Sequence, residues 1–477
     1  MYISINFALM CDRSMTFQEC ELTILRAAVD NKNTQVKTSE AKAPQIKKMI
    51  SIVEDFIRQK KLICYGGTAI NNILPVKDQF YDYNSEIPDY DFFSQNALED
   101  TKELTDIYYK HGYTEVEGKA GVHHGTYKVF VNFIPMADIT YIQKDLFQKI
   151  QNESTKVDGI LYCAPNYLRM SMYLELSRPD GDTSRWEKVL KRKTLLDKHY
   201  PLKIKNCSSS SALSTSSKNT TINNITKSVC SEMECVFFGG FAISLYQDYS
   251  QQMKRKLKNK QTYERIDVIN TNPSKVANII KERLELSNVS DVAIDKHDGV
   301  MDLIKTHFEV RVGKRIICLI YEPIACHSFN NIEIDTRTYK IATIDTLLSF
   351  YLLFTFINRP YFNREKLLCT SDFLFELQQS NRLKQKGIMK RFTTKCYGKQ
   401  DTLIELRANK GAVYEELRHN KNTREYDEWF LKYRPDDMKS NKIQSRVKTR
   451  KTKKKNKLTR KLKLLPSQLY GLRNIFV

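Results

Sequence analysis

The sequence lacks the features that mark membrane-spanning, secreted and zinc-binding proteins. Its most apolar stretch, residues 347–357, is about half as long as the roughly 20 residues that cross a membrane, so a buried core helix is the better interpretation. The N-terminus carries a short apolar run without a basic leader, and we expect no signal peptide. The 11 cysteines form no Cys-x-x-Cys pair, and Cys64 and Cys318 lie in apolar runs. We therefore expect reduced, buried thiols, a reducing compartment and no zinc site.

Acidic residues are few relative to basic ones. The 477 residues include 77 Lys and Arg against 55 Asp and Glu, which gives a net charge of +22, and 41% of the residues are hydrophobic. This composition excludes global disorder and a coiled coil, and the charge favours a polyanionic partner, either nucleic acid or an anionic membrane surface. Residues 439–463 contribute 13 basic residues and no acidic one. We expect this block to be an unfolded tail with non-specific RNA affinity; a localisation signal or a merely solvated arm are the alternatives.

Two changes of composition divide the chain. A Ser- and Thr-rich stretch of low complexity separates two halves of comparable size, and the basic block begins near Pro435. We predict an N-terminal segment (1–45), a first domain (46–206), a linker (207–221), a second domain with a helical extension (222–435) and a basic tail (436–477).

The two halves repeat one order of motifs. Each has an apolar run ending in two glycines, a helix, a short strand, an amphipathic helix and further strands with alternating polarity. The glycine motifs lie at 60–74 and 234–246, and the short strands at 88–97 and 265–273. We predict an α+β fold made by tandem duplication of one unit, in which helices flank a mixed sheet.

Three aspartates in the first half follow a pattern suited to metal-dependent phosphate chemistry. Asp89 and Asp91 alternate along a strand, so both carboxylates share one face of it. Asp138 ends an apolar strand that could lie beside them. Three converging carboxylates suit two divalent cations about 4 Å apart. Solvated acids at strand ends are the alternative for each element taken singly, but the ordered set favours a site.

Further residues near these aspartates suit phosphate binding. Gly66 and Gly67 join a strand end to a helix, where glycine permits close approach and the first N–H groups favour phosphate. Arg185, Lys188 and Arg192 have helical spacing and share one face, although a solvated charged face is an equal alternative.

Another pair of candidates lies on a more apolar stretch. Tyr167 and Arg169 could stack on an incoming base or bind RNA, but positions of this kind more often belong to the core.

The motifs YGGTAI, PDYDFFS and MADITYI resemble those of the poly(A) polymerases of large cytoplasmic DNA viruses, the giant-virus, African swine fever virus and poxvirus group within the polymerase-β superfamily of nucleotidyltransferases. The resemblance covers roughly residues 46–201 and continues weakly beyond them. It departs from the superfamily pattern because 21 residues separate the glycines from Asp89. It implies that domain 46–206 is a catalytic nucleotidyltransferase domain of polymerase-β type.

The resemblance also implies roles for individual residues. Asp89 and Asp91 would bind two ions, Mg²⁺ or Mn²⁺, and Asp138 would bind the ion nearer the primer. The implied nucleotide-binding residues are Gly66, Gly67, Arg185 and Lys188. We also expect Thr68 and Tyr167 to bind the nucleotide.

The expected function is template-independent addition of AMP from ATP to RNA 3′ ends, with release of pyrophosphate. The alternatives are a nucleotidyltransferase with another acceptor, such as a tRNA or a small molecule, and a non-catalytic RNA-binding subunit. The resemblance further implies a homodimer, no membrane partner, and location in the host cytoplasm (the viral factory) and the virion.

The second half retains only part of the aspartate pattern. Aligning its glycines, Gly239 and Gly240, with those of the first half sets Asp267 against Asp91 and Arg265 against Asp89. Aligning PIAC with PMAD sets Cys326 against Asp138. We therefore expect the second unit to be a degenerate, non-catalytic copy, retained for packing or for holding RNA.

Overall fold

The computed structural model describes residues 14–84, 86–202, 204, 207, 217–254 and 265–435. The predicted tail, 436–477, and the linker residues 208–216 lie outside the described residues. Helix α8 begins at Ser217, so the prediction that the linker extends to residue 221 is wrong.

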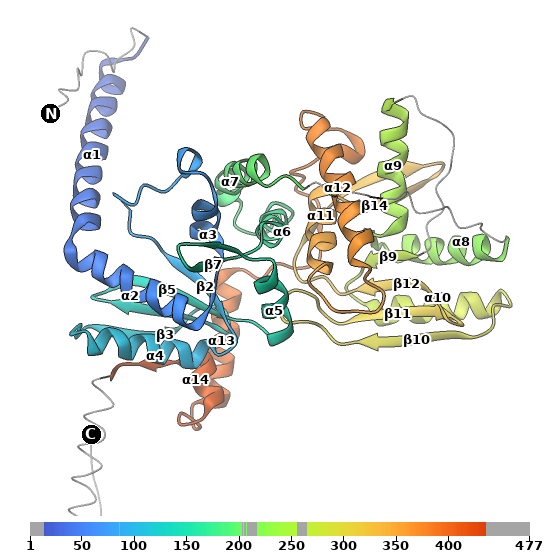
Figure 1. Cartoon of the computed structure of the whole chain (residues 1–477). Helices are drawn as coiled ribbons and strands as arrows, with labels where there is room; N and C mark the ends of the chain where they lie inside the picture. Colours follow the sequence, from blue (N-terminus) through green and yellow to red (C-terminus); the bar gives the residue numbers. More distant parts are fainter. Residues whose placement is uncertain are drawn as a thin grey trace, which may run out of the picture.

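The strands form two eight-stranded sheets (Figure 1). The first contains β1 (Ile63–Cys64), β2 (Tyr90–Ser94), β3 (Val116–Ala120), β4 (Thr126–Val131), β5 (Ile134–Tyr141), β6 (Thr155–Val157), β7 (Ile160–Tyr162) and β16 (Lys432–Tyr433). The second contains β8 (Val236–Phe237), β9 (Ile266–Ile269), β10 (Val292–His297), β11 (His307–Val312), β12 (Arg315–Tyr321), β13 (His327–Ile334), β14 (Arg337–Ala342) and β15 (Cys396–Tyr397).

The two sheets have the same topology. The first has the order β16-β3-β4-β5-β2-β1-β7-β6 and the second β10-β11-β12-β9-β8-β14-β13-β15. From β3 to β6, each strand is matched by the strand seven places later in the chain. The parallel pairs β2–β5 and β1–β7 recur as β9–β12 and β8–β14, and β1–β2 and β8–β9 are both antiparallel. The predicted duplicated α+β unit is confirmed at the level of the fold.

Helices flank both sheets. Those of the first half are α1 (Phe17–Lys42), α2 (Pro44–Lys60), α3 (Gly66–Ile73), α4 (Ala97–Lys110), α5 (Lys144–Asn152), α6 (Pro165–Leu176) and α7 (Trp186–His199), with short 3₁₀ turns η2 (Val76–Asp78) and η3 (Thr183–Arg185). The later ones are α8 (Ser217–Glu232), α9 (Gly240–Lys254), α10 (Pro273–Leu286), α11 (Ile344–Phe354), α12 (Arg364–Ser380), η4 (Gly387–Met389), α13 (Leu403–Leu417) and α14 (Arg424–Phe430). Among the described residues, no helix is both long and apolar enough to cross a membrane.

The sequence accounts for these elements through periodicity. Helix α2 starts with proline at its first turn and buries Met49, Val53, Phe56 and Ile57, which fall on one helical stripe. Strand β4 buries every second residue. The apolar stretch near residue 347 forms the buried helix α11, as predicted, and α11 packs on its counterpart α6 to join the two units.

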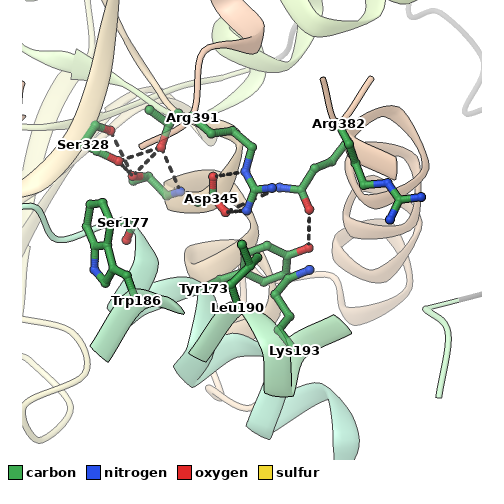
Figure 2. A network of polar contacts seen from close by, with 12 residues as sticks. Tyr173, Ser177, Trp186, Leu190, Lys193, Ser328, Asp345, Arg382 and Arg391 are labelled. Atoms are coloured by element: carbon green, nitrogen blue, oxygen red, sulfur yellow. Dashed lines mark hydrogen bonds and ion pairs between the residues drawn. The ribbon is translucent and has the colours of Figure 1, made fainter. Parts of the chain in front are cut away.

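A buried polar network lies at this junction (Figure 2). Asp345 at the start of α11 accepts hydrogen bonds from Nε and Nη2 of Arg391, at 2.7 and 2.6 Å. Tyr173 on α6 donates to Gln378 on α12 at 2.8 Å. All four side chains are buried. The Tyr173–Gln378 hydrogen bond crosses between the units, so their interface includes a specific polar contact as well as apolar packing.

The last described segment returns to the first unit. Strand β16 adds antiparallel to β3, and Lys102 on α4 forms an ion pair with Asp427 on α14 at 2.8 Å. Lys410 on α13 donates to the carbonyl of Gly121 at 2.6 Å. The end of the predicted second domain, 222–435, therefore packs against the first unit, because these contacts join it to the first sheet.

The cysteines divide into two groups. Cys64 and Cys318 are free and buried, as expected. Disulfides join Cys207 to Cys369 and Cys326 to Cys396, contrary to the expectation of reduced thiols throughout. The partners are 162 and 70 residues apart in sequence, so only the fold brings them together.

Candidate active site

The three aspartates converge on one face of the first sheet. Strands β2 and β5 are parallel neighbours, and their register sets Asp91 directly opposite Asp138. Asp89 precedes Asp91 by two residues and therefore faces the same way. The predicted convergence of the three carboxylates is present in the structure.

Burial and the neighbouring carboxylates change the pKa values of Asp89 and Asp91. Burial, followed by the charges of Asp89 and Asp138, raises the pKa of Asp91 to about 7. Asp89 remains exposed, yet loss of hydration and the charge of Asp138 also raise its pKa. Three converging carboxylates, of which Asp89 and Asp91 have raised pKa values, form a site that favours cations.

Lys128 is a neighbour of the carboxylates that the sequence analysis missed. It lies opposite Asp138 on β4, and its Nζ forms an ion pair with one oxygen of that carboxylate. The other oxygen, Oδ1, is buried and has no hydrogen-bond partner among the described residues. In a regular hairpin, counting back from the two-residue turn at 132–133 would set Lys128 opposite Ala137. A bulge at Met136 shifts the register by one residue, so Lys128 faces Asp138 instead.

The two glycines are explained by what lies against them. Gly66 has a φ of +71°, and a Cβ there would lie 2.6 Å from Oδ2 of Asp91. A Cβ on Gly67 would lie 2.4 Å from the Tyr81 hydroxyl and 2.8 Å from Nη1 of Arg192. The left-handed backbone therefore requires glycine at Gly66, whereas a side chain at Gly67 would displace the ends of Tyr81 and Arg192. The first N–H groups of α3, which have no acceptor within the helix, start beside the carboxylates.

The Thr68 side chain is engaged in a hydrogen bond within the protein. Its hydroxyl donates to the backbone carbonyl of Asp89 at 2.7 Å, and the side chain is buried. Among the groups of Thr68, only the backbone N–H remains for the predicted contact with a nucleotide.

Tyr167 was predicted to bind the nucleotide, and the structure contradicts this. Its ring is buried edge-on between Phe93 and Phe356. Arg169 is fully buried, where it donates to Asp197 at 2.8 Å and to the carbonyl of Tyr200. Apolar packing and internal ion pairing on α6 decided both positions, so the core alternative is correct.

The predicted cations gather at the start of α7. The charge of Arg192, then burial and the charge of Arg185, lower the pKa of Lys188. The charge of Arg185 also acts to lower the pKa of Asp91. Arg185 is itself paired with Glu175 at 3.2 Å. These residues form a cationic face next to the carboxylates.

The second unit has different residues at the positions that correspond to the aspartates of the first unit. Its register matches Asp267 to Asp91 and Arg265 to Asp89, as predicted, and Nε of Arg265 lies 2.6 Å from Oδ1 of Asp267. The residue opposite Asp267 on β12 is Leu319.

The predicted match of Cys326 to Asp138 is therefore wrong. Cys326 lies beyond the end of β12 and forms a disulfide. The third carboxylate is nonetheless absent from the second unit, and an internal ion pair occupies the place of the other two.

Comparisons with known proteins agree with this arrangement. Residues 51–182 match the model of the family described as poly(A) polymerase catalytic subunit. A predicted poly(A) polymerase catalytic subunit of Acanthamoeba polyphaga mimivirus is 34% identical over 178 residues, and one of African swine fever virus is 34% identical over 171 residues. These alignments cover 36% and 35% of this chain and 30% and 36% of the relatives, so the chain spans about a third of the length of the curated relatives it matches.

The likeness in fold extends further. The crystal structure of the Megavirus polyadenylate synthase matches with a TM-score of 0.73 and 21% identity, over 92% of each chain. The glycine turn and the three aspartates lie inside the segment that matches the family. The resemblance of this chain to viral poly(A) polymerase catalytic subunits is therefore confirmed.

Proposed function

We propose that this protein is a template-independent poly(A) polymerase that transfers AMP from ATP to RNA 3′ ends and releases pyrophosphate. The observation that carries the proposal is the convergence of Asp89, Asp91 and Asp138 beside the glycine turn at the start of α3. The relatives that match this region are named poly(A) polymerase catalytic subunits, which supports the same reaction.

The residues present fit a pair of divalent cations, Mg²⁺ or Mn²⁺. Asp138 has a buried oxygen without a partner among the described residues, and burial together with the charges of Asp89 and Asp138 raises the pKa of Asp91. Asp89 and Asp91 would hold both ions, and Asp138 the ion nearer the primer. Bound there, the ions would lower the pKa of the attacking hydroxyl and neutralise the leaving pyrophosphate.

The protein's own groups orient the nucleotide. The N–H groups at Gly66 and Gly67 point to the phosphates, because the start of a helix carries donors without internal acceptors. Arg185 and Lys188 oppose the charge of the triphosphate from the start of α7. Asp138 holds the side of the site where the RNA 3′ hydroxyl enters.

One experiment separates this function from its alternatives. Labelled RNA is incubated with Mg²⁺ or Mn²⁺ and each nucleotide in turn, and the Asp89→Ala/Asp91→Ala variant serves as control. A long ladder with ATP alone supports the proposal. Addition of a few nucleotides, or use of CTP, supports an enzyme acting on tRNA. If no extension depends on the two aspartates, the result supports a non-catalytic RNA-binding subunit.

We also propose a homodimer, located in the host cytoplasm (the viral factory) and in the virion. Light scattering of the full chain tests the dimer: a mass of about twice the 55.8 kDa of one chain supports it, and the monomer mass contradicts it.

A further inference from the structure

The long segment between the glycine turn and Asp89 is anchored rather than loose. Residues 76–84, called here the strap, follow α3 and run back over it. Asn71 on α3 is fully buried, and its side-chain oxygen accepts the backbone N–H groups of Phe80 at 2.8 Å and Tyr81 at 2.9 Å. One buried amide thus holds the aromatic part of the strap in place.

The strap is also tied to α7. Asp78 accepts hydrogen bonds from Lys198 at 3.0 Å and from His199 at 2.6 Å. Both partners lie in the last turn of α7. The strap therefore connects the helix that begins with the glycine turn to the helix that carries the cationic face (Figure 1).

The aromatic residues of the strap hold one guanidinium of α7. The guanidinium carbon of Arg192 lies 4.6 Å from the ring centre of Phe80 and 5.2 Å from that of Tyr81. Its Nη2 donates to the Tyr81 hydroxyl at 2.7 Å. Stacking and this hydrogen bond fix both the position and the rotation of the planar group.

This guanidinium lies over the glycine turn. The position of a Cβ on Gly67 is 2.8 Å from Nη1 of Arg192, whereas the corresponding position on Gly66 is 2.6 Å from the Asp91 carboxylate. Consecutive Cα atoms are about 3.8 Å apart. Two consecutive residues of the turn therefore contact opposite charges: Gly66 lies against the Asp91 carboxylate and Gly67 against the Arg192 guanidinium.

Arg192 differs from its neighbours on α7 in having no carboxylate partner among the described residues. Lys191 pairs with Glu187 at 2.5 Å and Lys193 with Asp197 at 2.6 Å. Arg192 is half-buried and positioned at the cost of side-chain freedom, yet most of its N–H donors are unused. A guanidinium whose N–H donors are free, next to the N–H groups at the start of a helix, is suited to binding a phosphate.

We infer that Arg192 binds the phosphates beyond the α-phosphate of the nucleoside triphosphate, and that the strap positions it through Phe80 and Tyr81. The inference rests on the proposed function, since the α-phosphate then lies at the three carboxylates. The charge of the β- and γ-phosphates extends along the turn to Arg192.

The test uses the full chain with Arg192→Lys and Tyr81→Phe, and Lys191→Ala as the matched control on the same helix. Binding of ATP, ADP and AMP is measured in the presence of Mg²⁺ by calorimetry, together with KM and kcat for RNA extension. We expect Arg192→Lys to weaken ATP binding about tenfold and AMP binding less than twofold. Lysine keeps the positive charge, but it has no planar group to stack on the aromatic rings and cannot donate two parallel hydrogen bonds to a phosphate. Tyr81→Phe removes one hydroxyl and should weaken ATP binding a few-fold. Lys191→Ala should change neither.

Equal losses for ATP and AMP, or no loss, would overturn the inference. Melting temperatures identify a variant that loses binding through unfolding, and Tyr81→Phe, which keeps the ring, then decides. If the wild-type protein binds ATP but does not extend RNA, the proposed function fails and the binding comparison still tests Arg192. If it extends RNA and Arg192→Lys leaves the KM for ATP unchanged, the inference alone fails.

Discussion

Single residues carry the geometry of the site, and Gly66 is the clearest case. Its backbone is left-handed, and its Cα faces the carboxylate of Asp91 so closely that no side chain fits. The requirement is local, and the pair of glycines in the sequence signals it. The same turn lets the α3 N–H groups start beside Asp91 and Asp89.

Gly66→Ala is therefore expected to destabilise the protein by about 1–3 kcal/mol, because a left-handed backbone is strained for alanine and the Cβ meets Asp91. RNA extension should fall with it, since Asp91 must move. Gly411→Ala is the control: this glycine lies inside α13 with open space around it among the described residues, so alanine should be neutral or stabilise by up to about 1 kcal/mol. Urea unfolding measures both; equal effects would contradict the assignment of the turn.

His327 makes stability depend on pH. It is fully buried on β13 without a hydrogen-bond partner among the described residues, and burial, followed by the charge of Arg178, lowers its pKa to about 3. The folded state keeps the ring neutral, while the unfolded chain binds a proton below about pH 6.5. The resulting stability is present above pH 6.5 and is lost as the pH falls toward 3.

His327→Phe should abolish that part of the acid sensitivity. Between pH 7 and pH 5 the wild-type protein should lose about 2 kcal/mol more unfolding free energy than the variant. His419→Phe, an exchange of an exposed histidine, serves as the control. Parallel pH profiles of wild type and His327→Phe would show that His327 takes up its proton in the folded state.

At the scale of elements, the sequence predicted what depends on short-range order and missed what depends on register. Sequence patterns predicted the glycine turn, the alternation around Asp91 and the repeated order of strands and helices. A bulge of one residue in β5 sets Lys128 against Asp138, and no repeat or motif indicates it. The matching bulge in β12 sets Leu319 opposite Glu309, and Leu319, not Cys326, faces Asp267 on the neighbouring strand β9.

The buried Asp345–Arg391 pair, which lies in the second half beside the junction, can be tested at the scale of elements. Asp345→Ala leaves the Arg391 guanidinium buried without its partner, so we expect a loss of about 3–5 kcal/mol in unfolding free energy. The double variant Asp345→Leu/Arg391→Met replaces both charges with apolar groups and should recover most of that loss. Chemical denaturation followed by circular dichroism measures both. A loss below about 1 kcal/mol in the single variant would mean that water replaces the missing carboxylate.

At the scale of the whole molecule, one fold carries two copies of a site and only one has three carboxylates. In the second copy Arg265 neutralises Asp267 and Leu319 stands opposite it. A cation at the place of a metal ligand excludes the arrangement of the first copy. The net charge of +22 remains a property of the chain as a whole, and the block 439–463 that supplies much of it lies outside the described residues.

Asp267→Asn should therefore leave RNA extension within about twofold of wild type per folded molecule, whereas Asp91→Asn should reduce it by at least a hundredfold, the scale expected for losing a metal ligand. Melting temperatures of the two variants correct for unfolded protein. If Asp267→Asn stopped extension in a folded protein, the second unit would not be a non-catalytic copy.

The sequence by itself determined the duplicated α+β plan, the glycine turn and the three aspartates, because each follows from backbone conformation or alternation within a few residues. Only the tertiary structure decided that Tyr167 belongs to the core, that Lys128 pairs with Asp138, and that β16 returns to the first sheet. It also decided that Tyr81 holds Arg192 over the turn, across 111 residues of sequence. These outcomes depend on a one-residue register shift and on contacts between distant segments, which local sequence patterns do not encode.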